Sequence, residues 1–233
     1  MPEHKYHVKV VDQIDQYETC KKTTITIKMS SQKIPSIVIG RLPLYLRVLT
    51  QIEAKEVRIT SSQEMGEYLG ISSAQIRKDL LHFGEFGKQG TGYNVRFLKS
   101  QLMKILQVDR EWNIALVGAG GLGTAIVKYA GFQGRGFQIA LVFDNDPSKI
   151  GQTLENLTIL SSNNIKQEIE LMKLKIAMVA VPAKYAQEVT NQLIEAGIRS
   201  ILNYAPTNLS VPPKVRIVHI DPVIGLQHMT YYL

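Results

Sequence analysis

The chain has 233 residues, 45% of them hydrophobic, so it can bury a substantial core as one large domain or two of ordinary size. It carries a formal net charge of +7 and one cysteine, which excludes a disulfide within the chain and a cysteine-rich zinc site. No apolar run reaches the ~18 residues that a membrane span needs, and the first thirty residues lack a secretory pattern. We therefore expect a cytoplasmic protein that does not contact a membrane.

The positive charge is concentrated in the first half of the chain. Residues 1–110 hold 17 lysines and arginines against 11 acidic residues, whereas residues 111–233 hold 10 against 9. A local basic excess favours a nucleic-acid partner for the N-terminal half. An ordinary basic surface is the alternative reading of charge alone.

The chain begins with a stretch that lacks a core pattern. We expect residues 1–34 to be an N-terminal extension, for which disorder is one alternative and a later functional start at Met29 another. A DNA-binding domain is predicted for residues 35–110. Its first helix is expected to open at Pro35 and to run to about Glu53, because the apolar residues between them recur at mostly helical spacing.

Two capping boxes follow in close succession. Ser61 precedes Glu64 by three residues, and Ser72 precedes Gln75 by three, so each serine marks a helix start. Gly70 lies between them, at the position of a tight bend. Two short helices joined by a glycine turn are typical of a helix-turn-helix.

A basic hairpin is expected after the second of these helices, which should run from Ser73 to about Phe83. Residues 84–95 are rich in glycine and contain Lys88, a pattern that indicates a short wing. The order of these elements predicts a winged helix.

Candidate DNA contacts lie mainly in the first turns of the second helix, which enters the major groove in such folds. Gln75 can pair with adenine and Arg77 with guanine, while Lys78 is better suited to phosphate. A solvated helix face is the alternative for any one of them. The candidates are Arg58, Ser73, Gln75, Arg77, Lys78 and Lys88.

From residue 111 onward, apolar strand runs alternate with mostly amphipathic segments. Such alternation predicts an α/β domain with a doubly wound parallel sheet covered on both faces, here over residues 111–220. The expected strands are Ile114–Val117, Ile139–Phe143, Ile176–Val181, Ser200–Asn203 and Val215–His219.

The first of these strands leads into a glycine motif, and a helical stretch from Thr124 to Tyr129 is expected after it. In a Rossmann fold the first glycine permits a tight turn, the second lets a pyrophosphate approach the backbone, and the third lets helix and strand pack closely. The candidate cofactor-binding residues are Gly118, Ala119, Gly120, Gly121, Leu122 and Gly123.

Asp144 ends the second strand run, 21 residues past Gly123. A carboxylate there hydrogen-bonds the adenosine ribose hydroxyls and repels a 2′-phosphate, which favours NAD(H) over NADP(H). A Rossmann fold that has lost its ligand is the alternative.

A dehydrogenase is the competing functional class. Such enzymes need an acid–base residue and a substrate pocket, commonly supplied by a further domain or by a Tyr-xxx-Lys pair after the glycines. Here the pair Tyr17 and Lys21 precedes the glycines, and His219 and His228 suit structural roles better than catalytic ones. We therefore expect no enzyme activity and no catalytic or metal site.

The sequence resembles the Rex family of redox-sensing transcriptional repressors from about Pro35 to Leu233. The departure from the family is the long N-terminal extension. The resemblance is carried, besides the glycine motif, by residues 41–47, 74–80, 83–87, 90–95, Phe143–Asp144, 181–183, 186–187, 196–198 and 201–206.

This resemblance implies a homodimer that binds an inverted-repeat operator and leaves it when NADH binds, with NAD+ competing for the site. It places Pro182 at the nucleotide. It also implies that the C-terminal helix, residues 221–233, swaps between subunits, although its own sheet is an alternative partner. A repressor that responds to another dinucleotide is a further alternative.

The resemblance further places Arg47, Tyr129 and Asp221 together at the junction between domains. We hypothesise that this set re-pairs between the DNA-bound and the NADH-bound states, because the two ligands must favour different dimer arrangements. A static ion pair between Arg47 and Asp221 is the alternative.

Overall fold

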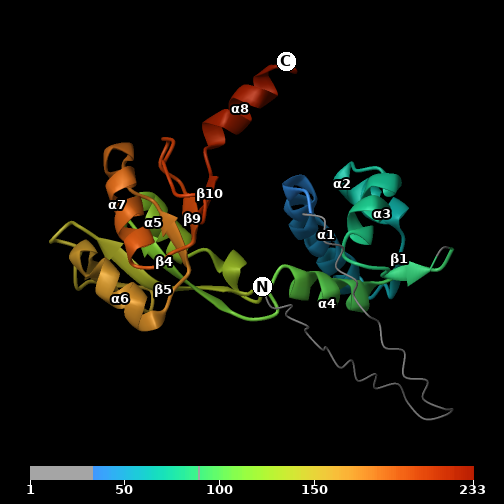
Figure 1. The fold of residues 1–233 in the computed structure, drawn as a ribbon, viewed down its shortest axis with the longest axis horizontal. Coiled ribbons are helices and arrows are strands. Elements are labelled where there is room, and N and C mark those ends of the chain that lie inside the picture. The colour runs from blue at the N-terminus through green and yellow to red at the C-terminus, as the bar shows by residue number, and fades with distance from the viewer. Residues whose placement is uncertain (1–33, 89) are drawn as a thin grey trace, which may run out of the picture.

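The computed structural model describes residues 34–88 and 90–233. The expected extension, residues 1–34, and the Tyr17–Lys21 pair lie almost wholly outside these ranges. Figure 1 shows a helical N-terminal part beside an α/β part built on one large sheet, with the C-terminal helix projecting from the latter. No helix of the described ranges is both long enough and apolar enough to cross a membrane.

The N-terminal part is a winged helix with a small sheet at one side. Its strands lie in the order β1-β3-β2 and are antiparallel. Four helices enclose a core that includes Leu42, Leu49, Met65, Ile76 and Leu98. The elements are α1 (Ser36–Ala54), β1 (Ile59–Thr60), α2 (Ser62–Leu69), α3 (Ser73–Leu81), β2 (Gly87–Lys88), β3 (Gly92–Asn94) and α4 (Val95–Ile105).

Both expected helix starts are confirmed in this part. The side chains of Ser61 and Ser72 accept hydrogen bonds from the backbone N–H groups of Glu64 and Gln75, at 3.0 and 3.2 Å. Gly70 adopts the left-handed conformation that ends α2, with φ of +66°. Each box is only half formed, because the side chains of Glu64 and Gln75 bond elsewhere.

Three features of this part differ from expectation. Helix α3 ends at Leu81, two residues early, and β1 joins the wing as a third strand. The wing ends at Asn94, whose side chain caps α4 by accepting from the backbone N–H of Phe97 at 2.9 Å. Sequence reasoning extended the wing to Val95 and overlooked α4.

The C-terminal part is a doubly wound α/β sheet, as predicted. Its parallel strands lie in the order β7-β5-β4-β8-β9-β10, and β6 pairs with β7 in the antiparallel sense at the edge. The strands are β4 (Trp112–Val117), β5 (Phe137–Asp144), β6 (Thr153–Leu154), β7 (Leu157–Ser161), β8 (Ile176–Val179), β9 (Ser200–Asn203) and β10 (Arg216–His219).

Helices cover both faces of this sheet. One core cluster joins the sheet to α6 and α7 through Ile165, Ile169 and Leu193, and another joins it to α5 through Ile126. The direction of winding reverses between β4 and β8, where open α/β sheets bind their ligands. The helices are α5 (Gly121–Val127), α6 (Ile165–Met172) and α7 (Ala183–Glu195), with 3₁₀ turns at Ala130–Phe132 and Ser162–Asn164.

Two expectations for this part were wrong. The helix after the glycine motif was expected over Thr124–Tyr129, but α5 begins at Gly121 and ends at Val127, because the glycines themselves form its first turn. The strand pair β6 and β7 was not expected at all.

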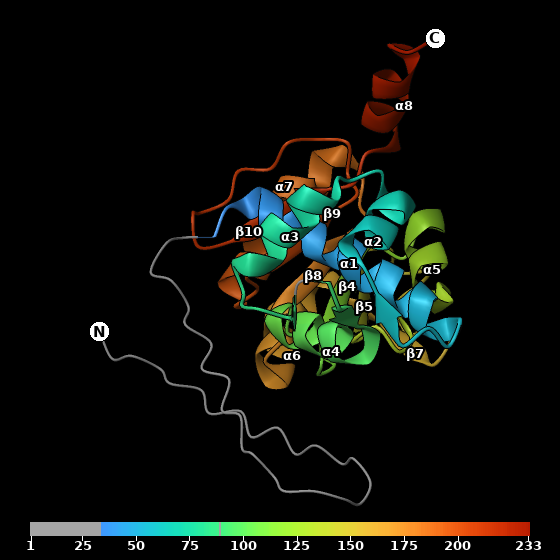
Figure 2. The same ribbon diagram turned by 90° about the vertical axis from the view of Figure 1, so that its right-hand side faces the viewer.

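The last helix, α8 (Pro222–Thr230), stands away from the sheet in both views (Figures 1 and 2). Asp221 is its N-cap, as predicted, and accepts a hydrogen bond from the backbone N–H of Val223 at 2.9 Å. Every residue from Pro222 to Leu233 is exposed. Within the described part of the chain, nothing therefore buries the apolar side chains of α8.

Candidate nucleotide and nucleic-acid sites

The glycine motif forms the turn between β4 and α5, at the reversal of the sheet. The backbone N–H of Gly118 donates to the carbonyl of Phe143 at 2.8 Å, and Gly118 has a φ of +103°. A Cβ at Gly118 would collide with the carbonyl of Ala180, and one at Gly123 with the carbonyl of Gly118. These two glycines are therefore required by the packing of the protein itself.

The middle glycines of the motif serve a different purpose. A Cβ added at Gly120 or Gly121 would meet nothing within 4 Å. Among residues 34–88 and 90–233, no side chain caps the first turn of α5, so its N–H groups are available to an anion. The protein therefore leaves open space and backbone donors where a pyrophosphate is expected.

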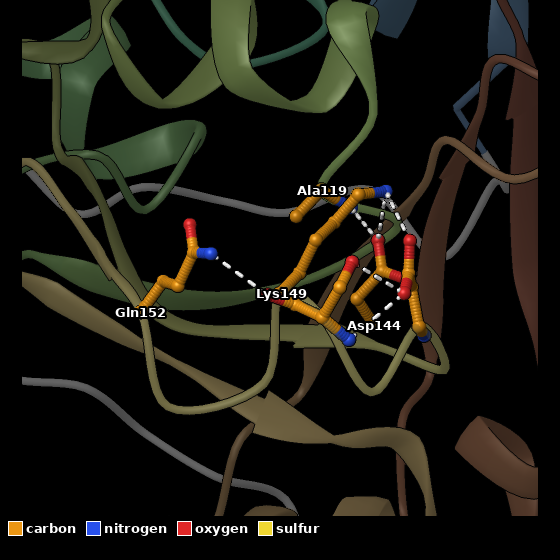
Figure 3. A network of polar contacts seen from close by, with 6 residues as sticks. Ala119, Asp144, Lys149 and Gln152 are labelled. Carbon is orange, nitrogen blue, oxygen red and sulfur yellow. Dashed lines mark hydrogen bonds and ion pairs between the residues drawn. The ribbon is translucent and has the colours of Figure 1, made fainter.

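Asp144 links the end of β5 to this turn (Figure 3). Its carboxylate accepts from the backbone N–H of Ala119 at 2.8 Å and from that of Asp146 at 2.9 Å. Burial alone would raise the pKa of Asp144, but these hydrogen bonds and the charge of Lys149 outweigh it, so the pKa is lowered. The carboxylate is thus ionised and held beside the glycine turn.

Lys149 is a member of this site that sequence reasoning missed. Its Nζ lies 3.4 Å from the Asp144 carboxylate and 3.8 Å from that of Asp146. The signal was present, since a lysine five residues after the acid can fold back from a turn. Two carboxylates against one ammonium leave this side of the glycine turn net negative.

The loop after β8 lies beside the glycine turn, at the same end of the sheet. The backbone N–H of Ala180 donates to the carbonyl of Val117 at 2.8 Å, and Pro182 is the exposed N-terminal cap of α7. The structure therefore brings Gly118–Gly123, Asp144 and Pro182 to the carboxyl ends of neighbouring strands.

The predicted base-reading helix presents its basic residues to solvent. Arg77 and Lys78 are exposed, and Ser73 is partly buried at the start of α3. The Arg77 guanidinium donates to the hydroxyl of Ser62 on α2 at 2.9 Å. Lys78 is thus exposed on the surface of α3, whereas Arg77 is held against the neighbouring helix.

Gln75 lies on α3 with its amide turned toward a buried carboxylate. Its Nε2 donates to Asp79 at 2.7 Å, and Asp79 is fully buried. The same carboxylate accepts from Arg41 through two nitrogens at 2.6 and 2.7 Å and from the Tyr45 hydroxyl at 2.6 Å. We refer to these four residues as the Asp79 cluster.

The hydrogen bonds of the Asp79 cluster stabilise an ionised Asp79, a charged Arg41 and a neutral Tyr45. Burial would raise the pKa of Asp79, but the hydrogen bonds from Arg41, Tyr45 and Gln75 lower it overall. The hydrogen bond to Asp79 raises the pKa of Arg41, and burial together with Asp79 raises that of Tyr45. Sequence reasoning missed this cluster, because nothing local pairs residues 38 positions apart.

The remaining predicted DNA contacts, Arg58 and Lys88, lie outside this helix, beside β1 and in β2. Arg58 is exposed just before β1, and its carbonyl accepts from the backbone N–H of Val95 at 3.0 Å. Lys88 is the last residue of β2, in the wing.

The three residues of the predicted switch lie on separate elements. Arg47 is exposed on α1, and Asp221 caps α8. Tyr129 is 58% exposed and packs edge-to-face on Phe132, with ring centroids 5.3 Å apart. Among the described residues of this single chain, no hydrogen bond or ion pair joins any two of the three.

Comparison with known proteins matches both halves of the chain. The family described as "Putative DNA-binding protein N-terminus" matches residues 33–80, and the family described as "CoA binding domain" matches residues 109–207. A "Redox-sensing transcriptional repressor Rex" from Roseiflexus sp. (strain RS-1) is 51% identical over 85% of this chain and 90% of its own length. One from Chloroflexus aurantiacus (strain ATCC 29366 / DSM 635 / J-10-fl) is 50% identical over 85% of this chain and 94% of its own.

Solved structures agree with this match. The crystal structure of RSP in complex with beta-NAD+ and operator DNA superposes with a TM-score of 0.82 at 35% identity, covering 87% of this chain and 93% of that one. The structure of RSP in complex with beta-NADH gives 0.79 at 33% identity, covering 87% and 95%.

A winged helix joined to a dinucleotide-binding sheet defines a class of transcription regulators that couple DNA binding to a nucleotide. The coverage and identity of these relatives are more specific than the class. The chain belongs to the family of redox-sensing transcriptional repressors called Rex.

Proposed function

We propose that this protein represses transcription by binding an inverted-repeat operator as a homodimer, and that it leaves the operator when NADH binds. The observation that carries the proposal is the open glycine turn with its ionised acid, in one chain with an exposed basic recognition helix. NADH and NAD+ compete for the turn, so the protein answers to their ratio. Because it binds operator DNA, we expect the protein to act in the cytoplasm.

NAD(H) is the favoured nucleotide because of the charge around Asp144. The adenosine ribose hydroxyls can donate to this carboxylate, which uses two strong hydrogen bonds within the protein and has capacity for more. A 2′-phosphate would meet two carboxylates, with Lys149 offsetting only one. NADPH should therefore bind more weakly than NADH.

The nucleotide is sensed and not consumed in this account. The described histidines of the C-terminal half serve other contacts. His219 Nδ1 lies 3.1 Å from the buried amide of Asn203, and His228 packs against Tyr232 at the end of the chain. Neither arrangement suits proton transfer to a bound nicotinamide, which argues against the alternative of a dehydrogenase.

The exposed α8 supports the dimer. Val223, Ile224, Leu226 and Met229 are each more than half exposed, and a helix that is apolar and uncovered calls for a partner surface. We assign residues 35–110 to DNA binding, 111–220 to the nucleotide and 221–233 to dimerisation. In this division α8 packs on the other subunit.

The same arrangement supports the switch. Arg47, Tyr129 and Asp221 are accessible in one chain, so a partner subunit can bring them together. Re-pairing of these residues between two dimer arrangements would then couple the nucleotide to the DNA-binding helices.

Fluorescence anisotropy of a labelled operator duplex tests the proposal. The duplex is first selected from a random pool by the nucleotide-free protein, and NADH, NAD+ and NADPH are then added in separate titrations. NADH should weaken binding roughly 5- to 150-fold, the usual range of allosteric coupling. NADPH should act only at higher concentration. Equal binding at saturating NADH would refute the sensing role.

A further inference from the structure

The side chain of Gln75 is held before any DNA arrives. Its backbone N–H donates to Ser72, and its side-chain nitrogen donates to Asp79 at 2.7 Å. The residue is only partly buried, so the rest of its amide can reach a ligand. The chemistry that Gln75 presents outward is therefore set by a buried carboxylate.

The carboxylate of Asp79 determines which way this amide faces. An ionised carboxylate only accepts hydrogen bonds, and it offers about four acceptor positions. Two nitrogens of Arg41, the hydroxyl of Tyr45 and the amide of Gln75 supply four donors. Turning the Gln75 amide over would place its oxygen against a carboxylate oxygen in a buried site, which is strongly unfavourable.

We propose that Asp79 is a positioning residue for sequence recognition, which fixes the Gln75 amide so that its oxygen and its second N–H read one adenine in each half-site. Adenine offers the matching pair, a donor at N6 and an acceptor at N7. Guanine offers acceptors at both O6 and N7, so the fixed oxygen would oppose O6. This inference rests on the proposed DNA binding.

We refer to this fixing of the Gln75 amide by Asp79 as the lock. Replacing Asp79 by Asn tests the lock with the smallest change of shape. Arg41 Nε and the Tyr45 hydroxyl both donate to one carboxylate oxygen, so the new oxygen should face them. The new NH₂ should then face Gln75 and also Arg41 Nη2, which loses its acceptor. The Gln75 amide would then turn its own oxygen inward and its nitrogen outward. The variant should lose its preference for adenine over guanine at one position, by roughly 5- to 150-fold.

The measurement is competition binding of the full chain to operator duplexes that each carry one substituted base pair. The Asp79→Asn and Gln75→Ala variants should lose discrimination at the same position and keep it elsewhere. The double variant should lose no more than Gln75→Ala alone. Tyr45→Phe is the matched control, because it removes a donor from the other carboxylate oxygen and leaves the Gln75 contact intact.

Three outcomes decide against the proposal. A uniform loss of affinity at every position in Asp79→Asn would show a purely structural role. An unchanged profile would show that Gln75 reads without the lock. A wild-type protein that selects no duplex at all would refute the proposed DNA binding, and this result is distinct from the other two.

A second measurement covers the case in which Asp79→Asn does not fold. In the wild-type protein without DNA, the side-chain NH₂ of Gln75 should give NMR signals that exchange with water at least about tenfold more slowly than those of the exposed Gln63. Equal exchange at the two glutamines would overturn the lock.

Discussion

The two halves of the molecule use a buried carboxylate in opposite ways. In the winged helix, Asp79 is saturated by side chains and closed to any ligand. In the nucleotide-binding half, Asp144 is held by two backbone N–H groups and lies at an open turn. The first carboxylate organises other side chains, whereas we propose that the second is itself a recognition group.

This difference follows from what each half must recognise. A base pair is distinguished by the order of donors and acceptors on its edge, so the reading side chains must be fixed in orientation. A pyrophosphate is distinguished by charge and size, so backbone donors and unfilled space are sufficient. The glycine motif reflects this division, with Gly118 and Gly123 packed and Gly120 and Gly121 open.

The largest effect should come from breaking the saturated carboxylate. Replacing Asp79 by Ala strands Arg41, whose side chain is only 20% exposed, and leaves Tyr45 and Gln75 without an acceptor. The free energy of unfolding of the winged helix should fall by about 3 kcal/mol, the lower end for a broken buried pair. Urea denaturation measures it. A fall below about 1 kcal/mol would contradict this role for Asp79.

Filling the open turn should give the next effect. Gly120→Val adds a side chain whose Cβ has no described atom within 4 Å and which should occupy the approach of the pyrophosphate. NADH affinity should fall by about 2 kcal/mol, roughly 30-fold, while thermal stability and operator binding without nucleotide are kept. Gly123→Ala is the contrasting variant, because its Cβ collides with Gly118 and should destabilise the fold. If titration shows that Gly120→Val binds NADH as tightly as the wild-type protein, the nucleotide binds elsewhere.

The link between the halves should be sensitive to Asp221. Asp221→Asn keeps a good N-cap for α8 and removes the charge available to Arg47. NADH should still bind, but its effect on operator affinity should shrink by about tenfold. Gel-shift titration with NADH measures the effect. Release identical to wild type would favour the static ion pair or no contact at all.

An effect of similar size is expected from Asp144 itself. Asp144→Asn retains one acceptor oxygen for Ala119 or Asp146 but loses the charge that favours the ribose hydroxyls. NADH affinity should fall about tenfold, as for loss of a hydrogen bond to a charged group. NADPH affinity should fall less or rise, because Lys149 is then opposed by Asp146 alone. Parallel titration calorimetry with both nucleotides checks the difference, and equal losses would reject the charge argument.

The smallest effect is a pH dependence. The pKa of Asp79 is lowered in the folded protein, so its contribution to stability is complete above the unfolded value of about 3.9 and is lost as the pH falls below it. The wild-type protein should lose stability between pH 5 and pH 3 more steeply than Asp79→Asn. Urea denaturation at both pH values tests this, and parallel losses would assign the titration to other groups.

The sequence predicted those features that depend on local pattern. Strand runs such as Ile114–Val117 are apolar enough to stand out, and serine caps act within three residues. Strand β7 escaped notice because Leu157–Ser161 contains polar residues and lies next to the short edge strand β6. Helix α4 escaped because Asn94 ends a strand and caps a helix at the same point.

The candidate site divides in the same way. Gly118–Gly123 and Asp144 lie at fixed spacing in one turn-and-strand unit, so a motif identifies them. The contact between Gln75 and Asp79 has a helical spacing of four residues, but the burial and ionisation of Asp79 could not be predicted, because they depend on Arg41 from another helix. Gln75 instead fits a capping box, which the structure only half forms.

The central claim is that nucleotide binding in one half changes DNA binding in the other. The most direct test is the affinity of the full-length protein for NADH, measured with and without saturating operator duplex. Thermodynamic linkage requires the duplex to weaken NADH binding by the same factor by which NADH weakens operator binding, roughly 5- to 150-fold. An NADH affinity that the operator leaves unchanged would contradict the account.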